Sequence, residues 1–226
     1  MRFNLLLGIF TALGISSGSQ AQDTSDTFSF NLFSFEGAYV NRVFNFDADY
    51  TAKYGIPIEV PFAVEIPVRQ DIELIADGKP SGGIVKFTFA AKSPEGRKFV
   101  ENLHIVGATF PIPQGGEDPM LARLKSAAKA LNQSAFPAAV QGYSDVKMIG
   151  TREIAVNGMR AVEILGRYQD PDNGSMVLQL VAIPHPDRAE SYFIVHNISQ
   201  TLVPLSGPEQ LPETLGGRVL DSFSYK

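Results

Sequence analysis

Residues 154–164 read Ile-Ala-Val-Asn-Gly-Met-Arg-Ala-Val-Glu-Ile, and this stretch sets the fold class of the chain. Ile154 and Val156 share one face of an extended segment before Asn157-Gly158, and apolar residues alternate again after that pair. Alternation with a period of two is typical of a β-strand with one buried face. Because asparagine and glycine both tolerate positive φ angles, the pair fits a tight two-residue turn. The stretch therefore predicts an antiparallel hairpin.

The segments that follow the hairpin extend it into a meander. Residues 176–183 are apolar except for Gln179, so this strand should be covered on both faces and lie centrally in its sheet. Together with strands at 146–156, 159–168 and 192–198, it predicts a four-strand antiparallel meander in the C-terminal half of the chain.

One helix is expected before the meander and one after it. Asp118 can cap a helix that begins at Pro119, where the missing N–H is tolerated. That helix should end before Pro137, because a proline disfavours helical backbone in the residue preceding it. After the meander, residues 208–222 carry an apolar stripe at i, i+4 and i+8, although two adjacent glycines weaken this second helix.

The front half of the chain adds β structure. Residues 22–36 carry alternating aromatics, which predict a strand or an extended arm packed on the body, with a partner-binding strand as the alternative. Residues 56–68 alternate too, but three prolines there favour an edge strand or an extended connector. Further strands are predicted at residues 37–50, 72–75, 84–90 and 100–110. We expect an α+β fold, a mainly antiparallel sheet flanked by helices with additional N-terminal β structure.

The first 21 residues have the layout of a cleaved export signal. Arg2 gives a positive start, an apolar run follows, and Ser19 and Ala21 are small residues at the positions that a signal peptidase reads. Residues 22–226 are then expected as a single exported domain, in the periplasm or secreted, with an optional lobe boundary near residues 111–117. No integral membrane segment is expected after signal cleavage, because no second long apolar run exists.

Composition excludes several classes of function. The 19 basic and 24 acidic residues give a formal net charge of −5, and no basic cluster occurs, which argues against nucleic acid as a partner. Cysteine is absent, so disulfides, thiolate metal sites and a cysteine nucleophile are excluded.

The histidines and acidic residues give no strong metal motif. His104, His185 and His196 lack the spacing of a local metal clamp; His196 is expected as a hydrogen-bonded structural residue and His185 as a solvated loop residue. Asp170 and Asp172 are the weak metal candidates, because their oxygens lie close together as calcium requires. A calcium loop would continue to a glycine and a glutamate that are missing here, so a solvated turn is favoured and no metal or cofactor is predicted.

Two serine motifs resemble catalytic signatures. The G-x-S-x-G match at residues 14–18 lies in the export signal and would be removed with it. Ser144 and Lys147 match S-x-x-K, but in a strand this spacing points the two side chains to opposite faces. We therefore predict no catalytic residue, although a site gathered from distant segments stays open.

Residues 118–223 resemble the PsbP-like fold family in the order helix, four-strand antiparallel meander, helix. The matching pieces are the hairpin at residues 154–161, the strand ending in Ile183-Pro184, residues 192–198 and the closing Leu220-Asp221-Ser222-Phe223. Family members often carry an early Pro-x-x-Trp element, and this chain has no tryptophan. The resemblance therefore leaves residues 22–110 unexplained.

The resemblance implies a binding or assembly role rather than catalysis. We expect an exported non-catalytic binding or assembly protein whose partner is an unknown protein or a small apolar ligand. The alternative is a periplasmic carrier of a lipid or another apolar small ligand, because a curved sheet closed by helices can hold an acyl chain. The 16 phenylalanines could line such a cavity.

Overall fold

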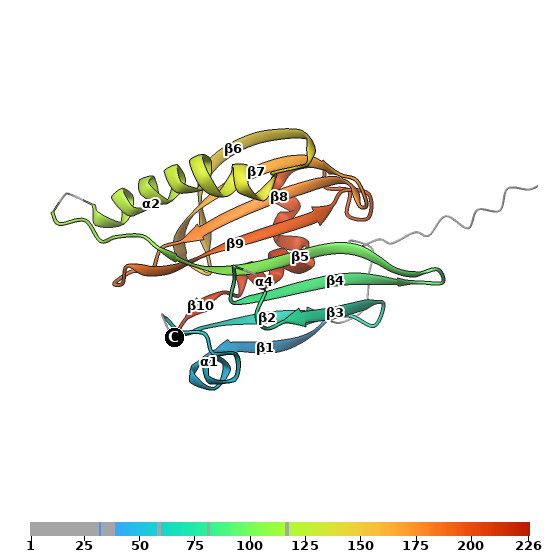
Figure 1. The fold of residues 1–226 in the computed structure, drawn as a ribbon, viewed down its shortest axis with the longest axis horizontal. Coiled ribbons are helices and arrows are strands. Elements are labelled where there is room, and N and C mark those ends of the chain that lie inside the picture. Colours follow the sequence, from blue (N-terminus) through green and yellow to red (C-terminus); the bar gives the residue numbers. More distant parts are fainter. Residues whose placement is uncertain (1–31, 33–38, 58–59, 81, 116–117) are drawn as a thin grey trace, which may run out of the picture.

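The computed structural model describes residues 32, 39–57, 60–80, 82–115 and 118–226, and within them two antiparallel sheets form the body (Figure 1). The large sheet has the strand order β3-β4-β5-β9-β8-β7-β6, and the small sheet the order β1-β2-β10. The large sheet contains β3 (Ile72–Asp77), β4 (Val85–Ser93), β5 (Gly96–Thr109), β6 (Ser144–Val156), β7 (Met159–Asp170), β8 (Gly174–Ile183) and β9 (Glu190–Ser199). The small sheet contains β1 (Val40–Phe46), β2 (Phe62–Val68) and β10 (Ser224–Tyr225). The predicted α+β class and the C-terminal meander are confirmed.

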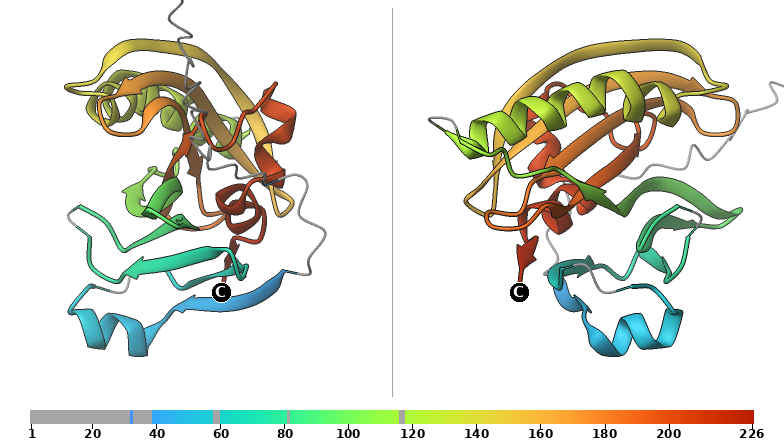
Figure 2. Two further views of the ribbon diagram at one scale, coloured as in Figure 1. Left: turned by 90° about the vertical axis from the view of Figure 1, so that its right-hand side faces the viewer. Right: turned by 60° about the vertical axis from the view of Figure 1, so that its left-hand side comes forward.

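Both faces of the large sheet carry other elements of the fold (Figure 2). Helix α2 (Pro119–Ala130) packs on β7 and β8 on one face, while α4 (Leu215–Asp221) and the small sheet lie on the other. Along β8, Leu178 and Leu180 join the core under α2, and Val177 and Val181 pack in the opposite core. This confirms that β8 is central and covered on both faces.

The hairpin turn is formed as predicted. Val156 pairs with Met159, and Asn157 and Gly158 between them adopt φ angles of 45° and 78°. Both values lie in the left-handed region that a tight antiparallel turn of this kind requires.

Replacing Gly158 with alanine is expected to lower the free energy of unfolding by about 1 kcal/mol, because a Cβ disfavours positive φ. A Cβ at this position would meet nothing within 4 Å, so the effect is one of backbone conformation alone. Gly150→Ala is the matched control: its Cβ also meets nothing, and its φ is not positive. Urea denaturation of both variants checks this, and equal losses of stability would contradict the assignment.

A helix that the sequence analysis missed begins within the predicted strand at residues 37–50. Strand β1 ends at Phe46, and the Asp47 carboxylate accepts a hydrogen bond from the Tyr50 amide at 3.0 Å, capping α1 (Ala48–Tyr54). The expected strand was too long because an aspartate before a helical turn is a start signal that outweighs the surrounding aromatics.

The prediction that residues 56–68 form an edge strand is wrong, because β2 is the middle strand of the small sheet. β1 pairs along its whole length on one side, whereas β10 pairs on the other side only at Ala63 and Phe62. The Glu65 amide points away from β1, to the Ser222 hydroxyl. Pro67, two residues on, has its missing donor on that same unpaired side, where it removes no ladder hydrogen bond.

The expected end of the helix before Pro137 is also wrong. After α2 the chain makes a π-helical turn, η1 (Leu131–Ala135), and continues as α3 (Phe136–Ala139). The Phe136 amide bonds to the Leu131 carbonyl, five residues back. Because this wider turn changes the hydrogen-bond pattern just before the proline, Pro137 occupies the start of a new helix, where its missing N–H is tolerated.

The tail forms two short helices in place of one. A 3₁₀ helix, η2 (Pro208–Glu213), precedes α4, and Thr214 between them caps α4 through its hydroxyl. The predicted apolar stripe is buried, as expected. Phe62 stacks on Phe46 at a ring-centroid distance of 5.1 Å and on Phe223 at 5.2 Å, which joins the small sheet to the end of the chain. These phenylalanines therefore pack against one another in the core.

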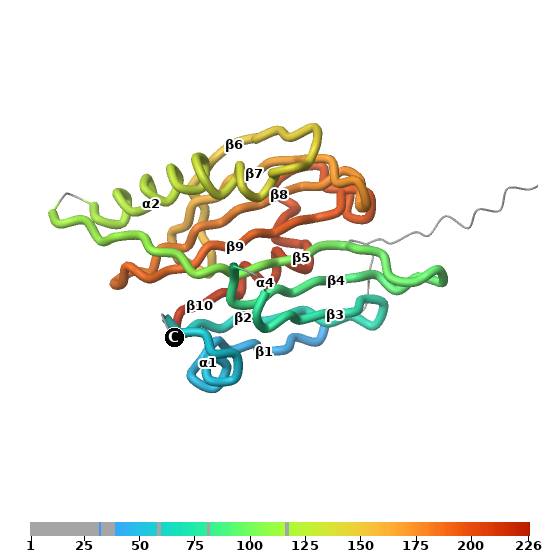
Figure 3. The backbone as a smooth tube through the Cα atoms, in the orientation of Figure 1, coloured from blue at the N-terminus to red at the C-terminus, as the bar shows by residue number. Residues whose placement is uncertain are grey.

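Strands from both sides of residues 111–117 belong to one sheet, since β5 pairs with β9 from Glu101–Ile198 to Thr109–Glu190 (Figure 3). In the described part of the chain, no helix combines the length and apolarity needed to cross a membrane. The predicted export signal at residues 1–21 lies outside the described residues. So does the aromatic segment 22–36, apart from Leu32, which is buried.

Candidate binding cleft

The face of the large sheet that carries α2 is only partly covered. Figure 1 shows α2 lying along the upper strands of the sheet, while β4 and β5 lie farther from it, beyond β9. A cleft of about 380 Å³ opens there, and its lining comes from β4, β5, β9, β8 and β7 together with Tyr143 from the segment after α3. Five adjacent strands thus supply a concave floor.

A row of polar side chains crosses this floor. In the strand register Thr88 lies opposite Asn102, and Asn102 lies opposite Asn197. Residues directly opposite one another on paired strands point to the same face of the sheet. Three neighbouring strands therefore each place a polar group in the cleft.

Hydrogen bonds fix the orientation of the two asparagines. The Tyr168 hydroxyl donates to Asn197 Oδ1 at 3.0 Å, and Asn197 Nδ2 donates to Asn102 Oδ1 at 3.1 Å. Burial, and after it the neighbouring Tyr143, raise the pKa of Tyr168, so its phenol keeps its proton and stays a donor. Within the described residues, Asn102 Nδ2 donates to no protein group and is left as a donor for a ligand.

An exposed aromatic ring forms one wall of the cleft. The Tyr143 ring is tilted over that of Tyr168 with 4.4 Å between centroids, and Tyr143 remains 38% exposed. Gly142, with a φ of 87°, turns the chain there, and the Tyr143 amide bonds to the Val140 carbonyl. The outer face of Tyr143 is a platform for a planar or apolar part of a ligand.

The positive charge of the cleft belongs to Lys86. Lys86 lies opposite His104 in the register, and burial, followed by the charge of Lys86, lowers the pKa of His104. His104 is therefore neutral near pH 7. Asp77 lies opposite Lys86 on the neighbouring strand β3, but its carboxylate accepts a hydrogen bond from the Lys79 amide. Within the described ranges Lys86 forms no ion pair.

The predicted metal candidates lie at the rim, where they close a turn. Asp170 Oδ1 accepts hydrogen bonds from the amides of Asp172 and Asn173 and from Asn173 Nδ2, at 2.8 to 3.0 Å. This is the arrangement of an aspartate that stabilises a turn. Among the described residues no group of three or more His, Asp or Glu side chains could hold a metal ion.

His196 lies on the opposite face of the sheet, in a row of buried polar groups. Its Nδ1 contacts Gln179 at 2.8 Å and its Nε2 contacts Glu101 at 2.7 Å. Gln179 donates to Glu163 at 2.7 Å, and Arg152 donates to the other oxygen of Glu163 at 2.5 Å. The row therefore crosses β5, β9, β8, β7 and β6 in order, and the expectation of a hydrogen-bonded structural histidine is confirmed.

The Glu101 carboxylate also accepts hydrogen bonds from the N-terminus of α4. The amides of Leu215 and Gly216 each donate to it at 2.9 Å, and a negative charge is favoured at a helix N-terminus. A Cβ at Gly216 would lie 2.3 Å from His196 Nε2. Gly216, which has a low helix propensity, is thus what allows α4 to approach the buried pair of His196 and Glu101.

The expectation that His185 is a solvated loop residue is wrong. Its Nδ1 accepts hydrogen bonds from the amides of Asp187 and Arg188, and its ring packs on Tyr225 with 4.6 Å between centroids. Burial lowers the pKa of His185, so the ring is a neutral acceptor that shapes the loop before β9.

The side chains of the cleft were not found from the sequence. Asn102, Asn197, Tyr143 and Lys86 come from separate segments, and only the strand pairing brings them together. The local sequence does not single out Asn102 or Asn197, because each strand also carries other polar residues, among them Glu101 and His196.

No family model and no curated protein matches the chain. Solved structures are similar to it over most of its length. Cyanobacterial PsbP from Synechocystis sp. PCC 6803 is 15% identical with a TM-score of 0.43, over 85% of this chain and 98% of that one. The Saccharomyces cerevisiae Ran-binding protein Mog1p is 11% identical with a TM-score of 0.43, over 83% and 96%.

LpqN, which is involved in cell envelope biogenesis of Mycobacterium tuberculosis, is 10% identical with a TM-score of 0.42, over 82% of this chain and 91% of that one. The weak resemblance to the PsbP-like fold that residues 118–223 suggested is thus found again. These likenesses concern the fold alone.

Proposed function

We propose that this chain is an exported, non-catalytic binding protein that holds a segment of a protein partner in the cleft on the open face of the large sheet. The observation that carries the proposal is the asparagine row, Asn102 and Asn197, beside the exposed ring of Tyr143 and the unpaired charge of Lys86. These groups converge on one concave surface.

Two groups in and beside the asparagine row are donors. Asn102 Nδ2 and the Lys86 ammonium both have protons available, while Asn102 Oδ1 and Asn197 Oδ1 already accept hydrogen bonds. A complementary partner presents acceptor oxygens, such as backbone carbonyls and carboxylates. A loop of a protein supplies both, together with a side chain that can pack on Tyr143.

The state of the histidines supports a role without catalysis. His196 is bound by Glu101 and Gln179, and His185 is occupied by two backbone amides. His104 borders the cleft, but its Nε2 is buried against Gly83 and forms no hydrogen bond within the described residues. A general base must reach the proton that it removes.

The layout of residues 1–21 supports a periplasmic or secreted location for the mature protein. The pairing of β5 with β9 across residues 111–117 supports a single domain over residues 22–226.

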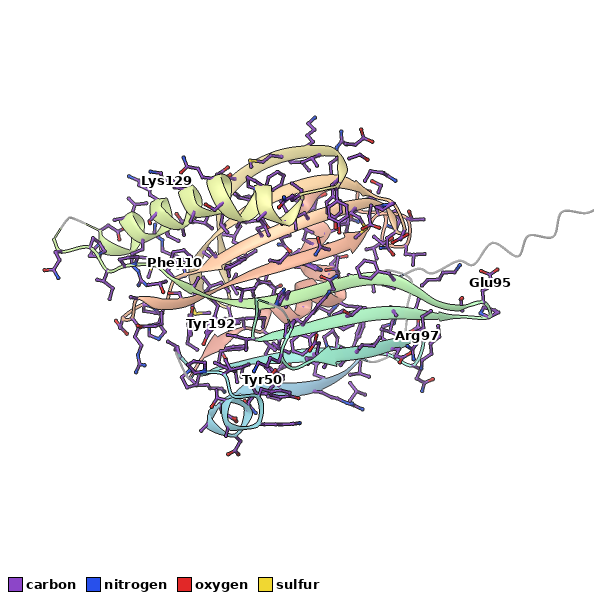
Figure 4. The ribbon with its side chains drawn as sticks, in the orientation of Figure 1. Tyr50, Glu95, Arg97, Phe110, Lys129 and Tyr192 are labelled. Carbon is purple, nitrogen blue, oxygen red and sulfur yellow. The ribbon has the colours of Figure 1, made fainter. Side chains whose placement is uncertain are left out.

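A photo-reactive cross-linker placed at Tyr143 should capture one discrete protein in the cells that make this chain. The matched control position is Lys129, which projects from the outer side of α2 (Figure 4). Adducts of equal yield at both positions, or none at Tyr143, would contradict the proposal.

Replacing Asn102 and Asn197 together with alanine should weaken partner binding by about 5-fold, because the hydrogen bond of roughly 1 kcal/mol from Asn102 Nδ2 is lost together with the side chain that orients it. The yield of the Tyr143 adduct measures this in cells, and thermal unfolding confirms that the double variant is folded. Thr151→Ala, on β6 away from the cleft, should leave the yield unchanged.

A further inference from the structure

A groove with a different chemistry lies on the opposite face of the large sheet. It runs between β6, β7 and β8 and the segment of residues 200–211, and its volume is about 440 Å³. Leu165 and Val177 form its floor, and Ile149, Leu205 and Leu211 form its sides. This lining is mainly apolar, in contrast to the amide row of the cleft.

The outer wall of the groove is held in place by hydrogen bonds. The Gln200 amide donates to the Ser175 carbonyl at 2.9 Å, and its side chain donates to the Leu205 carbonyl at 3.0 Å. The Ser206 amide donates to the side chain of Gln210 at 2.6 Å. The wall is therefore preformed, so a ligand does not need to order it on binding.

Two cations lie on neighbouring strands at the groove, one of them in its lining. Arg167 on β7 lines the groove and is exposed, and Lys147 on β6 lies directly opposite it in the register. Like charges opposite one another on paired strands repel. In the part of the chain that the structure describes, neither forms an ion pair, whereas Arg97, Arg152 and Arg160 each pair with a carboxylate.

Apolar walls and an unpaired cation at one end are complementary to a molecule with an alkyl chain and an anionic head. The volume lies in the lower part of the range of small-molecule sites, which is roughly 300–1,000 Å³, and favours one alkyl chain over two. We propose that this groove is a second binding site, independent of the cleft, for a single-chain alkyl carboxylate whose head group pairs with Arg167.

Two probes with the same chain and opposite head charges test the proposal. Isothermal titration of the mature protein below the critical micelle concentrations should show dodecanoate binding at least about 10-fold more tightly than dodecyltrimethylammonium, since the cations repel the second probe. Arg167→Gln should lower the affinity for dodecanoate by about 10-fold, the loss of one charge-assisted pair. Leu205→Glu should abolish binding of dodecanoate by placing a charge in the apolar wall.

Arg97→Gln, near the tip of the β4–β5 hairpin (Figure 4) and not among the groove-lining residues, is the matched control and should leave dodecanoate affinity unchanged. Circular dichroism checks that each variant is folded. Absence of saturable dodecanoate binding would overturn the proposal. So would equal affinities in Arg167→Gln and Arg97→Gln, or a loss of dodecanoate binding in the asparagine double variant of the cleft.

Discussion

Replacing Glu101 with alanine is expected to lower the free energy of unfolding by about 4 kcal/mol, because removal of one partner leaves the rest of a buried polar group unsatisfied. The Glu101 carboxylate is fully buried and accepts hydrogen bonds from two amides of α4 while contacting His196. Without it, both amides and the imidazole lose their partner together. Urea denaturation of the mature protein measures the loss.

Two further variants show how much of the loss of stability comes from the charge of Glu101 and how much from its burial. Glu101→Gln keeps the shape and one acceptor oxygen, so a smaller loss of stability is expected than for alanine. Glu73→Ala removes a carboxylate whose partner, Arg97, is largely exposed, and a loss below about 1 kcal/mol is expected. If Glu101→Ala and Glu73→Ala were equally stable, the buried row would have no role in holding α4.

Arg123→Met is the second substitution with a large expected effect, a loss of about 3 kcal/mol, because buried carbonyl groups lose their donors. Arg123 is only 2% exposed and donates to the carbonyls of Phe110, His185 and Arg188, and among the described residues it forms no ion pair. The burial of this cation lowers its pKa, yet the guanidinium stays charged. Through these hydrogen bonds Arg123 links α2 to the loop between β8 and β9.

The test of this role compares Arg123→Met with Lys125→Met on the same helix. Lys125 is exposed, so its replacement should change the free energy of unfolding by less than about 0.5 kcal/mol. Arg123→Lys should not rescue stability, because an ammonium cannot span the same set of carbonyls. Wild-type stability in Arg123→Met would rule out the fastening role.

Local signals predicted the meander well. The turn at Asn157-Gly158 and the doubly covered strand β8 follow from residues that are neighbours in the sequence. The errors arose where tertiary structure overrides a local rule. Pro137 is accommodated by a π-helical turn that no propensity indicates. Gly216 is required because a side chain there would collide with His196, a contact that the sequence does not reveal.

The cleft could not be predicted for a similar reason. Its floor depends on the pairing of β4 with β5 and of β5 with β9, a contact between segments nearly a hundred residues apart. Asn102 and Asn197 have meaning only in that register, because a shift of one residue would turn them to the other face. The sequence pointed instead to Asp170, whose side chain closes the rim turn.

The most direct test of the account uses the absence of cysteine, since an introduced thiol is the only one in the chain. Thr88→Cys reports on the floor of the cleft and Lys129→Cys on the exposed side of α2. A small maleimide that does not cross the inner membrane should label Lys129→Cys equally fast in cells and in the purified protein. It should label Thr88→Cys about 10-fold more slowly in cells, where a bound partner protects the cleft. If the ratio of the labelling rate in cells to the rate in the purified protein were the same for both thiols, an occupied cleft would be contradicted. If neither thiol were labelled in intact cells, export of the protein would be contradicted.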